Sequence, residues 1–134
     1  MPYFVKNEKL FFVLGDNFFE NNPLEGFNLN QFHSGAFIFT KMVDNPEEFG
    51  VAQMDQDGNV ISIEEKPEMP KSNDAVVGAY MFDESVFEKI SILQPSARGE
   101  YEITDLCNLY VNEKNCKNSS IDGWWIDAGT PERI

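Results

Sequence analysis

The sequence predicts an α/β fold in which a mixed, mostly parallel sheet is flanked by helices. Two observations support this fold class. Short apolar runs end repeatedly in Gly, Asp, Asn or Pro, as buried strands followed by turns do. Two later segments carry apolar residues at the spacing of a helix. The resulting order is strand, strand, hairpin, strand, helix, helix and strand.

Four apolar segments are expected to form single strands. They are residues 9–14 (KLFFVL), 35–42 (GAFIFTKM), 76–82 (VVGAYMF) and 121–126 (IDGWWI). The first has no polar break after its lysine, so we expect a strand that is buried on both faces. Residues 51–54 and 60–64 flank the turn sequence DQDG, which is typical of a β-hairpin.

Two segments are expected to form helices, at residues 84–92 and at residues 103–112. The residues expected to face inward are Val86, Phe87, Ile90, Leu106, Leu109 and Tyr110. No repeat or low-complexity linker divides the chain, so residues 1–134 are expected to belong to one domain. We expect a partial domain, because such strands usually need crossover helices before and after them.

The charge of the chain argues against several classes of partner. Ten Lys and Arg against 23 Asp and Glu give a net charge of −13, which opposes binding to nucleic acid and to anionic membranes. A phosphate ligand would therefore depend on a few well-placed cations or on a metal ion. Hydrophobic residues make up 42% of the chain, enough for a core, and 12 Phe predict that much of this core is aromatic.

The cysteines and the apolar runs indicate a cytoplasmic protein. Cys107 and Cys116 are too few for a disulfide framework and lack metal-ligand spacing, so we expect two ordinary thiols in a reducing compartment. No apolar run is long enough to cross a bilayer, and the first residues do not resemble a signal peptide. We therefore expect no membrane partner.

Five short motifs place charged residues or glycine beside predicted strands and turns. They are LGDN with Asp16, EFGV with Gly50, EEKP with Glu65 and Lys66, SARGE with Arg98, and WWIDAGT with Asp127. Ligands of open α/β sheets bind at the carboxyl ends of strands, where Asp16 and Asp127 are expected. Lys66 could meet a phosphate, and Glu65 could bind sugar hydroxyls. Each motif alone also fits a simple turn, a loop glycine, a solvated charge run or a helix cap.

Together, in this order and spacing, the motifs resemble the sugar-phosphate nucleotidyltransferases, most closely the glucose-1-phosphate thymidylyltransferases. The resemblance covers nearly the whole chain and implies a Rossmann-like nucleotidyltransferase domain. It implies Mg²⁺ as cofactor, with Asp16 and Asp127 as its ligands. It also implies that Lys66 and Arg98 are catalytic residues that bind the sugar phosphate. The positions that match glucose contacts are Gly50, Glu65 and Val76.

The resemblance implies dTTP and glucose 1-phosphate as substrates, and dTDP-glucose and pyrophosphate as products. Two positions depart from the family, since Phe49 stands where Tyr is common and Ala128 where Thr is common. The family's glycine-rich loop, GxGTRLxPxT, which grips the nucleotide, does not occur in these 134 residues. We therefore interpret the chain as the sugar-phosphate-binding half. We expect it to be inactive alone and to form a homo-oligomer through an uncovered face.

Two alternatives remain open from the sequence. The nucleotide could be UTP or CTP, because the residues that read the base belong to the absent part of the family pattern. The chain could also be a non-catalytic sugar-phosphate-binding module, although the presence of all five motifs argues against this. His33 lies in a loop-like stretch, and we expect no role for it.

Overall fold

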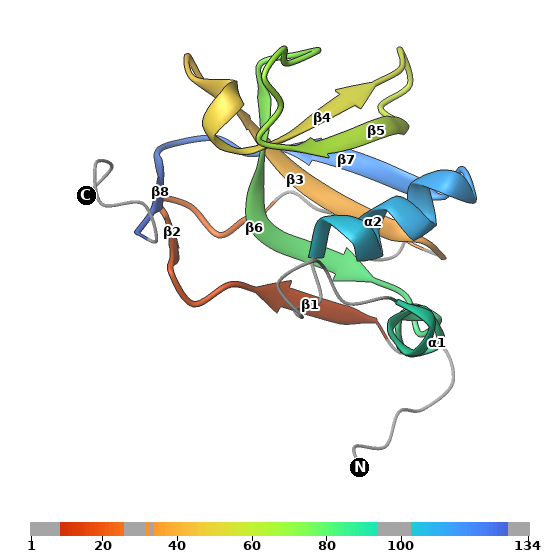
Figure 1. The fold of residues 1–134 in the computed structure, drawn as a ribbon. Helices are drawn as coiled ribbons and strands as arrows, with labels where there is room; N and C mark the ends of the chain where they lie inside the picture. The colour runs from red at the N-terminus through yellow and green to blue at the C-terminus, as the bar shows by residue number, and fades with distance from the viewer. Residues whose placement is uncertain (1–8, 26–31, 33, 94–102, 129–134) are drawn as a thin grey trace.

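A computed structural model describes residues 9–25, 32, 34–93 and 103–128 (Figure 1). Its centre is a six-stranded sheet. The strands of this sheet are β1 (Leu10–Val13), β3 (Ala36–Met42), β4 (Gly50–Met54), β5 (Val60–Glu65), β6 (Asp74–Phe82) and β7 (Cys116–Ser120). A separate two-stranded ribbon pairs β2 (Asn17–Phe19) with β8 (Trp125–Asp127). The helices are α1 (Val86–Ile92), α2 (Ile103–Asn112) and the short 3₁₀ helix η2 (Pro46–Glu48).

Strand β6 lies in the middle of the sheet and determines where an open space remains. Along one edge it pairs antiparallel with β3 from Asp74 to Phe82. Along the other edge it pairs with β4 at Ala75 and with β1 from Ala79 onward. Between these two neighbours, at residues 76–78, none of the described strands pairs with that edge of β6. This unpaired stretch leaves room for a cavity.

The mixed sheet with flanking helices is confirmed, but the expectation that it is mostly parallel is wrong for the described residues. Among them only β3 and β7 pair parallel, and the other strand pairs are antiparallel. A short turn joins β4 to β5 and forces antiparallel pairing, whereas a parallel pair needs a longer connection. Helix α2 completes such a connection, because it returns the chain to the start of β3, where Cys116 pairs with Ala36.

Most predicted elements form, and the misplaced one is near the C-terminus. The segments predicted at residues 9–14, 35–42, 51–54, 60–64, 76–82, 84–92 and 103–112 correspond to β1, β3, β4, β5, β6, α1 and α2. The strand predicted at residues 121–126 is wrong, because β7 ends at Ser120 and β8 begins at Trp125. Gly123 lies between them with φ of 83°. β7 is polar (CKNSS) and forms by pairing with β3 at the edge of the sheet.

The core consists of two clusters, one on each face of the sheet. Tyr80 and Phe82 of β6 belong to the cluster on the helix side, whereas Val77 and Met81 belong to the other. The helix side is the face of the central sheet over which α2 lies in Figure 1. Tyr80 stacks on Phe82 with ring centroids 5.9 Å apart, and Phe82 stacks on Tyr110 of α2 at 5.7 Å. The predicted aromatic core is therefore confirmed.

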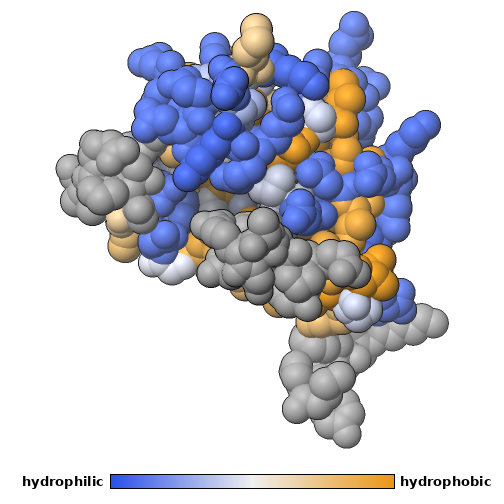
Figure 2. Space-filling model, viewed as in Figure 1, coloured by the Kyte–Doolittle hydropathy of each residue, from blue (hydrophilic) through white to orange (hydrophobic). Residues whose placement is uncertain are grey.

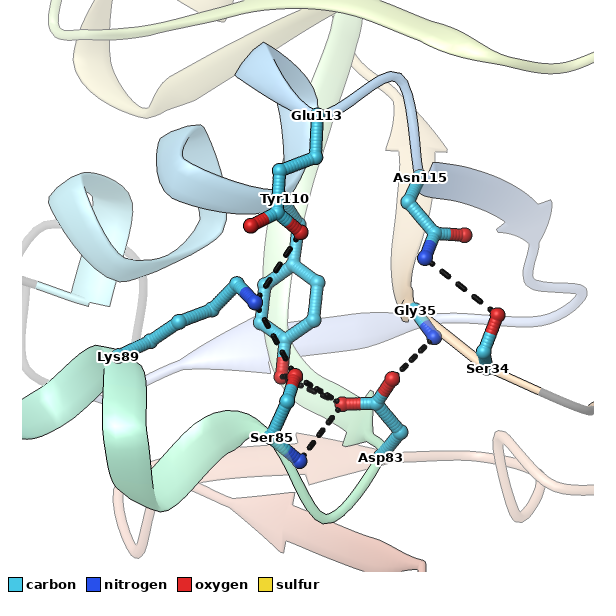
Figure 3. A network of polar contacts seen from close by, with 8 residues as sticks. All are labelled: Ser34, Gly35, Asp83, Ser85, Lys89, Tyr110, Glu113 and Asn115. Carbon is cyan, nitrogen blue, oxygen red and sulfur yellow. Dashed lines mark hydrogen bonds and ion pairs between the residues drawn. The ribbon is translucent and has the colours of Figure 1, made fainter.

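A polar network follows the end of β6 and attaches the helices to the sheet (Figure 3). The Asp83 carboxylate accepts hydrogen bonds from Gly35 N–H at 2.6 Å, from the Tyr110 hydroxyl at 2.9 Å, and from the Ser85 hydroxyl at 2.6 Å. Burial alone would raise the pKa of Asp83, but the hydrogen bonds from Ser85, Gly35 and Tyr110 outweigh burial and lower it. The network therefore stabilises the ionised carboxylate.

Lys89 of α1 belongs to the same network and is only 9% exposed. Its ammonium lies 3.1 Å from a Glu113 carboxylate oxygen, donates to Ser85 Oγ at 3.1 Å, and lies 4.3 Å from the centroid of the Tyr110 ring (Figure 3). Helix α1 is therefore turned so that Lys89 faces inward. Ile90, which the sequence predicted to face inward, is 43% exposed.

The two cysteines are free thiols buried in the helix-side cluster. Burial raises the pKa of both thiols, so they remain protonated at neutral pH. Both cysteines are thus the unbridged thiols that the sequence predicted. Of the described helices, none combines the length and the apolar character needed to cross a membrane.

The surface is mostly hydrophilic on the face shown in Figure 2, where hydrophobic residues gather toward α1. Large exposed hydrophobic side chains include Phe12 and Val13 of β1 and Phe18 of β2. Within the described residues, β1 pairs only with β6, so its second edge carries no strand. The open edge of β1 and these three side chains all belong to the N-terminal part of the described chain.

Candidate functional site

A cavity of about 670 Å³ opens beside β6, along the edge that β4 and β1 leave unpaired. Its walls come from β6, from the ends of β4 and β5, from the β2–β8 ribbon and from the first turn of α2. A space of this volume suits a small organic ligand. The cavity is therefore the natural place to look for the predicted site residues.

Six of the seven predicted site residues line this cavity. They are Asp16, Gly50, Glu65, Lys66, Val76 and Asp127. The seventh, Arg98, lies outside the described residues, so its convergence with Lys66 stays a prediction. The fold thus brings together motifs that are far apart in the sequence, which each motif alone could not guarantee.

The β2–β8 ribbon positions the two aspartates side by side. Asn17 of β2 pairs with Asp127 of β8, and Ala128 N–H donates to the Asp16 carbonyl at 2.8 Å. Asp16 therefore lies directly before β2, Asp127 is the last residue of the neighbouring strand β8, and both line the cavity. Carboxylate oxygens are the ligands that Mg²⁺ prefers, and it commonly takes only one or two of them from the protein. This donor set fits the metal site that the resemblance implies.

Lys66 enters the cavity through an unusual backbone conformation. Neighbouring residues of a strand point to opposite faces, so Glu65 and Lys66 could share a cavity only if the strand end bends. The bend lies at Lys66 itself, which has φ of 46° and donates its N–H to the Phe49 carbonyl at 2.9 Å. A left-handed conformation costs a non-glycine residue about 1–2 kcal/mol. Within the described residues, the Lys66 ammonium has no hydrogen-bond or ion-pair partner.

Glu65 is held between Gly50 and Thr104. Gly50 pairs directly with Glu65, and a Cβ at position 50 would lie 3.3 Å from Glu65 Oε2. Thr104 Oγ1, at the start of α2, donates to the same oxygen at 2.9 Å. One carboxylate oxygen is thus fixed by the protein, whereas Oε1 accepts no hydrogen bond from the part of the chain that the structure describes. Gly50 leaves the space that this arrangement needs.

The described lining of the cavity is acidic. It carries the carboxylates of Asp16, Glu48, Glu65 and Asp127, and a single ammonium, that of Lys66. Burial, followed by smaller contributions from Cys107, Glu65 and Asp127, raises the pKa of Tyr80, so its phenol stays protonated. An anionic ligand would therefore need Lys66 together with further positive charge.

Sequence reasoning missed four residues that shape the cavity. They are Asn17, Gly78, Thr104 and Trp125. Trp125 packs against Phe49, with ring centroids 5.0 Å apart, and it also lines the cavity. The motifs LGDN and WWIDAGT contain Asn17 and Trp125, and Thr104 stands at the start of a predicted helix, whereas Gly78 gave no local signal.

Comparison with known families agrees with this geometry. The chain matches the family model described as nucleotidyl transferase over residues 2–134, and it belongs to this family. The mixed sheet and its flanking helices are thus those of a nucleotidyltransferase fold.

Individual relatives are more specific. The glucose-1-phosphate thymidylyltransferase of Mycolicibacterium smegmatis is 40% identical over 130 residues, which are 94% of this chain and 45% of the relative. The low-salt glycan biosynthesis nucleotidyltransferase Agl11 of Haloferax volcanii is 39% identical over 98% of this chain and 37% of the relative. A solved structure from Bacillus anthracis, assigned as a glucose-1-phosphate thymidylyltransferase, has a TM-score of 0.81 and 42% identity over 95% of this chain and 52% of that chain. The chain spans about half the length of these relatives, or less.

Proposed function

We propose that this chain is the sugar-phosphate-binding half of a nucleotidyltransferase domain. In the complete enzyme, a phosphate oxygen of glucose 1-phosphate attacks the α-phosphorus of dTTP, the bond to pyrophosphate breaks, and dTDP-glucose forms. The observation that carries this proposal is the cavity around which the sugar and metal motifs gather. The names of the M. smegmatis and B. anthracis relatives support the choice of substrates.

The glucose ring would lie between Gly50, Glu65 and Val76. Gly50 leaves its backbone open to a ligand, and Val76 lies on the stretch of β6 that no described strand covers. Glu65 would accept hydrogen bonds from sugar hydroxyls through Oε1, since Thr104 occupies Oε2. Lys66, together with Arg98, would bind the phosphate. Their charges would hold and orient the attacking oxygen.

Asp16 and Asp127 would hold Mg²⁺, which would supply positive charge that offsets the negative charge of the phosphates when bound. Because a phosphate monoester is already an anionic nucleophile, the reaction needs no general base. The residues of the chain therefore bind, orient and neutralise charge, and do not move protons. The acidic lining agrees with a need for the metal ion and for Arg98, because the single ammonium of Lys66 cannot balance the negative charge of the phosphates of two substrates.

The proposal is tested by calorimetry with glucose 1-phosphate. Lys66→Ala is expected to lower the affinity at least about tenfold, because a hydrogen bond to a charged group contributes about 1.5–3 kcal/mol. The matched control is Lys71→Ala, whose exposed ammonium pairs with Glu64 at 3.8 Å. This control is expected to bind like the wild type. Equal affinities of the wild type and Lys66→Ala would remove Lys66 from the site.

The chain alone is expected to show no thymidylyltransferase activity, because its 134 residues lack the glycine-rich loop that would hold the triphosphate. Losing one preorganised donor costs about 10²–10³ in rate, and the loop supplies several. A pyrophosphate-release assay with Asp127→Asn as the blank measures this. Release above that blank would contradict the expectation.

UTP and CTP are the alternative nucleotides, because the nucleotidyltransferase Agl11, whose name specifies no base, is about as identical to this chain as the thymidylyltransferase of M. smegmatis. Assays of a complete protein with dTTP, UTP and CTP in parallel would choose between them. A non-catalytic sugar-phosphate-binding module would bind glucose 1-phosphate in the same calorimetry but would show no activity as a complete protein.

Self-association also stays a prediction. Phe12 and Val13 of β1 and Phe18 of β2 are between 41% and 52% exposed, and among the described residues no strand pairs with the second edge of β1. Apolar surface next to an unpaired strand edge favours association. Sedimentation of a clean monomer at high concentration would contradict it.

A further inference from the structure

Asn17 connects three parts of the candidate site through one carboxamide. Its Oδ1 accepts from Gly78 N–H of β6 at 2.9 Å and from Trp125 Nε1–H of β8 at 2.6 Å. Its Nδ2 donates to Asp16 Oδ1 at 3.0 Å. The reverse orientation of the carboxamide would point its donors at two other donors, so the network fixes this orientation.

The contact with Gly78 occurs on the edge of β6 that faces β4 and β1, at a point where none of the described strands pairs with it. The Gly78 carbonyl accepts from Leu14 N–H at 2.8 Å, and its N–H donates to Asn17. A buried backbone N–H without a partner is costly, so Asn17 replaces the missing strand at this point. The β2–β8 ribbon is not hydrogen-bonded into the main sheet as a strand, which makes this side-chain contact one of its attachments.

Gly78 leaves the space that Asn17 occupies. A Cβ at position 78 would lie 2.5 Å from Asn17 Nδ2 and 2.6 Å from its Cγ. Such distances are too short for real contacts, so any larger residue would displace the carboxamide. The φ of Gly78 is not in the left-handed region, and the required glycine is therefore explained by the neighbour and not by the backbone.

We propose that Asn17 is a positioning residue for the two aspartates of the candidate metal site. It orients the Asp16 carboxylate directly, and through Trp125 it holds β8, which carries Asp127, against β6. This inference rests on the proposed function, because it assigns the aspartates a ligand to bind. Residues that orient metal ligands typically affect metal affinity by about 10–100-fold.

The chemistry of the side chain separates this role from simple packing. An aspartate at position 17 could still accept from Gly78 and Trp125, but it could not donate to Asp16. An alanine could do neither. Asn17→Asp should therefore keep the ribbon attached, and Asn17→Ala should release it.

The first measurement is hydrogen exchange of the Trp125 indole N–H and the Gly78 amide, followed by NMR in this chain. We expect protection in the wild type and in Asn17→Asp, and at least about tenfold faster exchange of both protons in Asn17→Ala. Unchanged protection of both protons in Asn17→Ala would overturn the proposed attachment. This readout requires neither metal nor substrate, so it remains decisive even if the proposed function fails.

The second measurement is the binding of Mn²⁺, used as a paramagnetic probe of the candidate site. Asn17→Ala and Gly78→Ala are each expected to weaken Mn²⁺ binding by about 10–100-fold. Gly78→Ala should add little in the Asn17→Ala background, where the space is free. Equal Mn²⁺ affinity of the wild type and both single variants would overturn the positioning role. Equal affinity of the wild type and Asp16→Asn would instead contradict the proposed metal site.

Discussion

Two lysines of this chain lie in opposite surroundings. Lys89 is 9% exposed, and its ammonium is held by Glu113 and Ser85 over the ring of Tyr110. Lys66 is exposed, lines the cavity and has no side-chain partner within the described residues. The backbone around Lys89 is helical, whereas Lys66 has a left-handed φ of 46°.

The difference separates residues that stabilise the fold from residues that are available to a ligand. In the network around Asp83 and Lys89, the donors and acceptors bond to one another. These residues therefore stabilise the fold and are not available to a ligand. At the cavity, the backbone adopts a costly conformation that brings an unpaired cation to an acidic lining. We expect variants in the two regions to affect different measurements.

The largest effect on stability is expected at Asp83. Asp83→Ala removes a charged acceptor and leaves the donors of Gly35, Ser85 and Tyr110 without it. We expect the free energy of unfolding to fall by about 3 kcal/mol in urea denaturation, with no change in affinity for glucose 1-phosphate. A loss below about 1 kcal/mol would mean that this region is not the stabilising one.

The charge of Asp83 also predicts a dependence on pH. Because the pKa of Asp83 is lowered in the fold, its contribution is complete above the ordinary value of 3.8 and is lost as the pH falls through the lowered value. The difference in unfolding free energy between the wild type and Asp83→Asn should therefore shrink below about pH 4. Urea denaturation at several pH values measures this difference, and a constant difference down to about pH 2 would contradict it.

The two functions of position 66 can be separated. Lys66→Ala and Lys66→Gly both remove the ammonium, so both should lower the affinity for glucose 1-phosphate at least about tenfold. Gly adopts the left-handed conformation without the strain of a Cβ, so Lys66→Gly should be more stable than Lys66→Ala by about 1 kcal/mol. Calorimetry and urea denaturation of the two variants measure these effects. A less stable glycine variant would show that the strain at this position is absent.

The smallest effect is expected at Tyr110. Tyr110→Phe removes the hydroxyl that donates to Asp83 but keeps the ring that stacks on Phe82 and lies beneath Lys89. We expect a loss of about 1 kcal/mol in the free energy of unfolding, which is less than for Asp83→Ala. Thermal and urea denaturation measure it. If the two variants are equally destabilised, the ring and not the network carries the effect.

The sequence predicted the elements that have a strong local pattern. β3 and β6 are apolar runs, and α2 was predicted with its observed bounds. β7 and the β2–β8 ribbon were missed because β7 is polar and the ribbon strands have only three residues each. Such short elements form by pairing with partners far along the chain, which no local periodicity reveals.

The candidate site follows the same division. Asp16, Glu65 and Asp127 could be predicted because they stand in motifs at the ends of strands. Asn17 belongs to such a motif, but its role depends on Gly78 and Trp125, which are 61 and 108 positions away. A role that depends on contacts between distant segments needs the structure.

The cavity beside β6 is proposed to bind a sugar phosphate and a divalent cation together. A crystal structure of this chain grown with glucose 1-phosphate and Mn²⁺ would locate both ligands, because Mn²⁺ is identified by its anomalous signal. We expect the metal between Asp16 and Asp127 and the phosphate at the Lys66 ammonium. A sugar phosphate bound elsewhere, with this cavity empty, would show that the cavity is not the binding site.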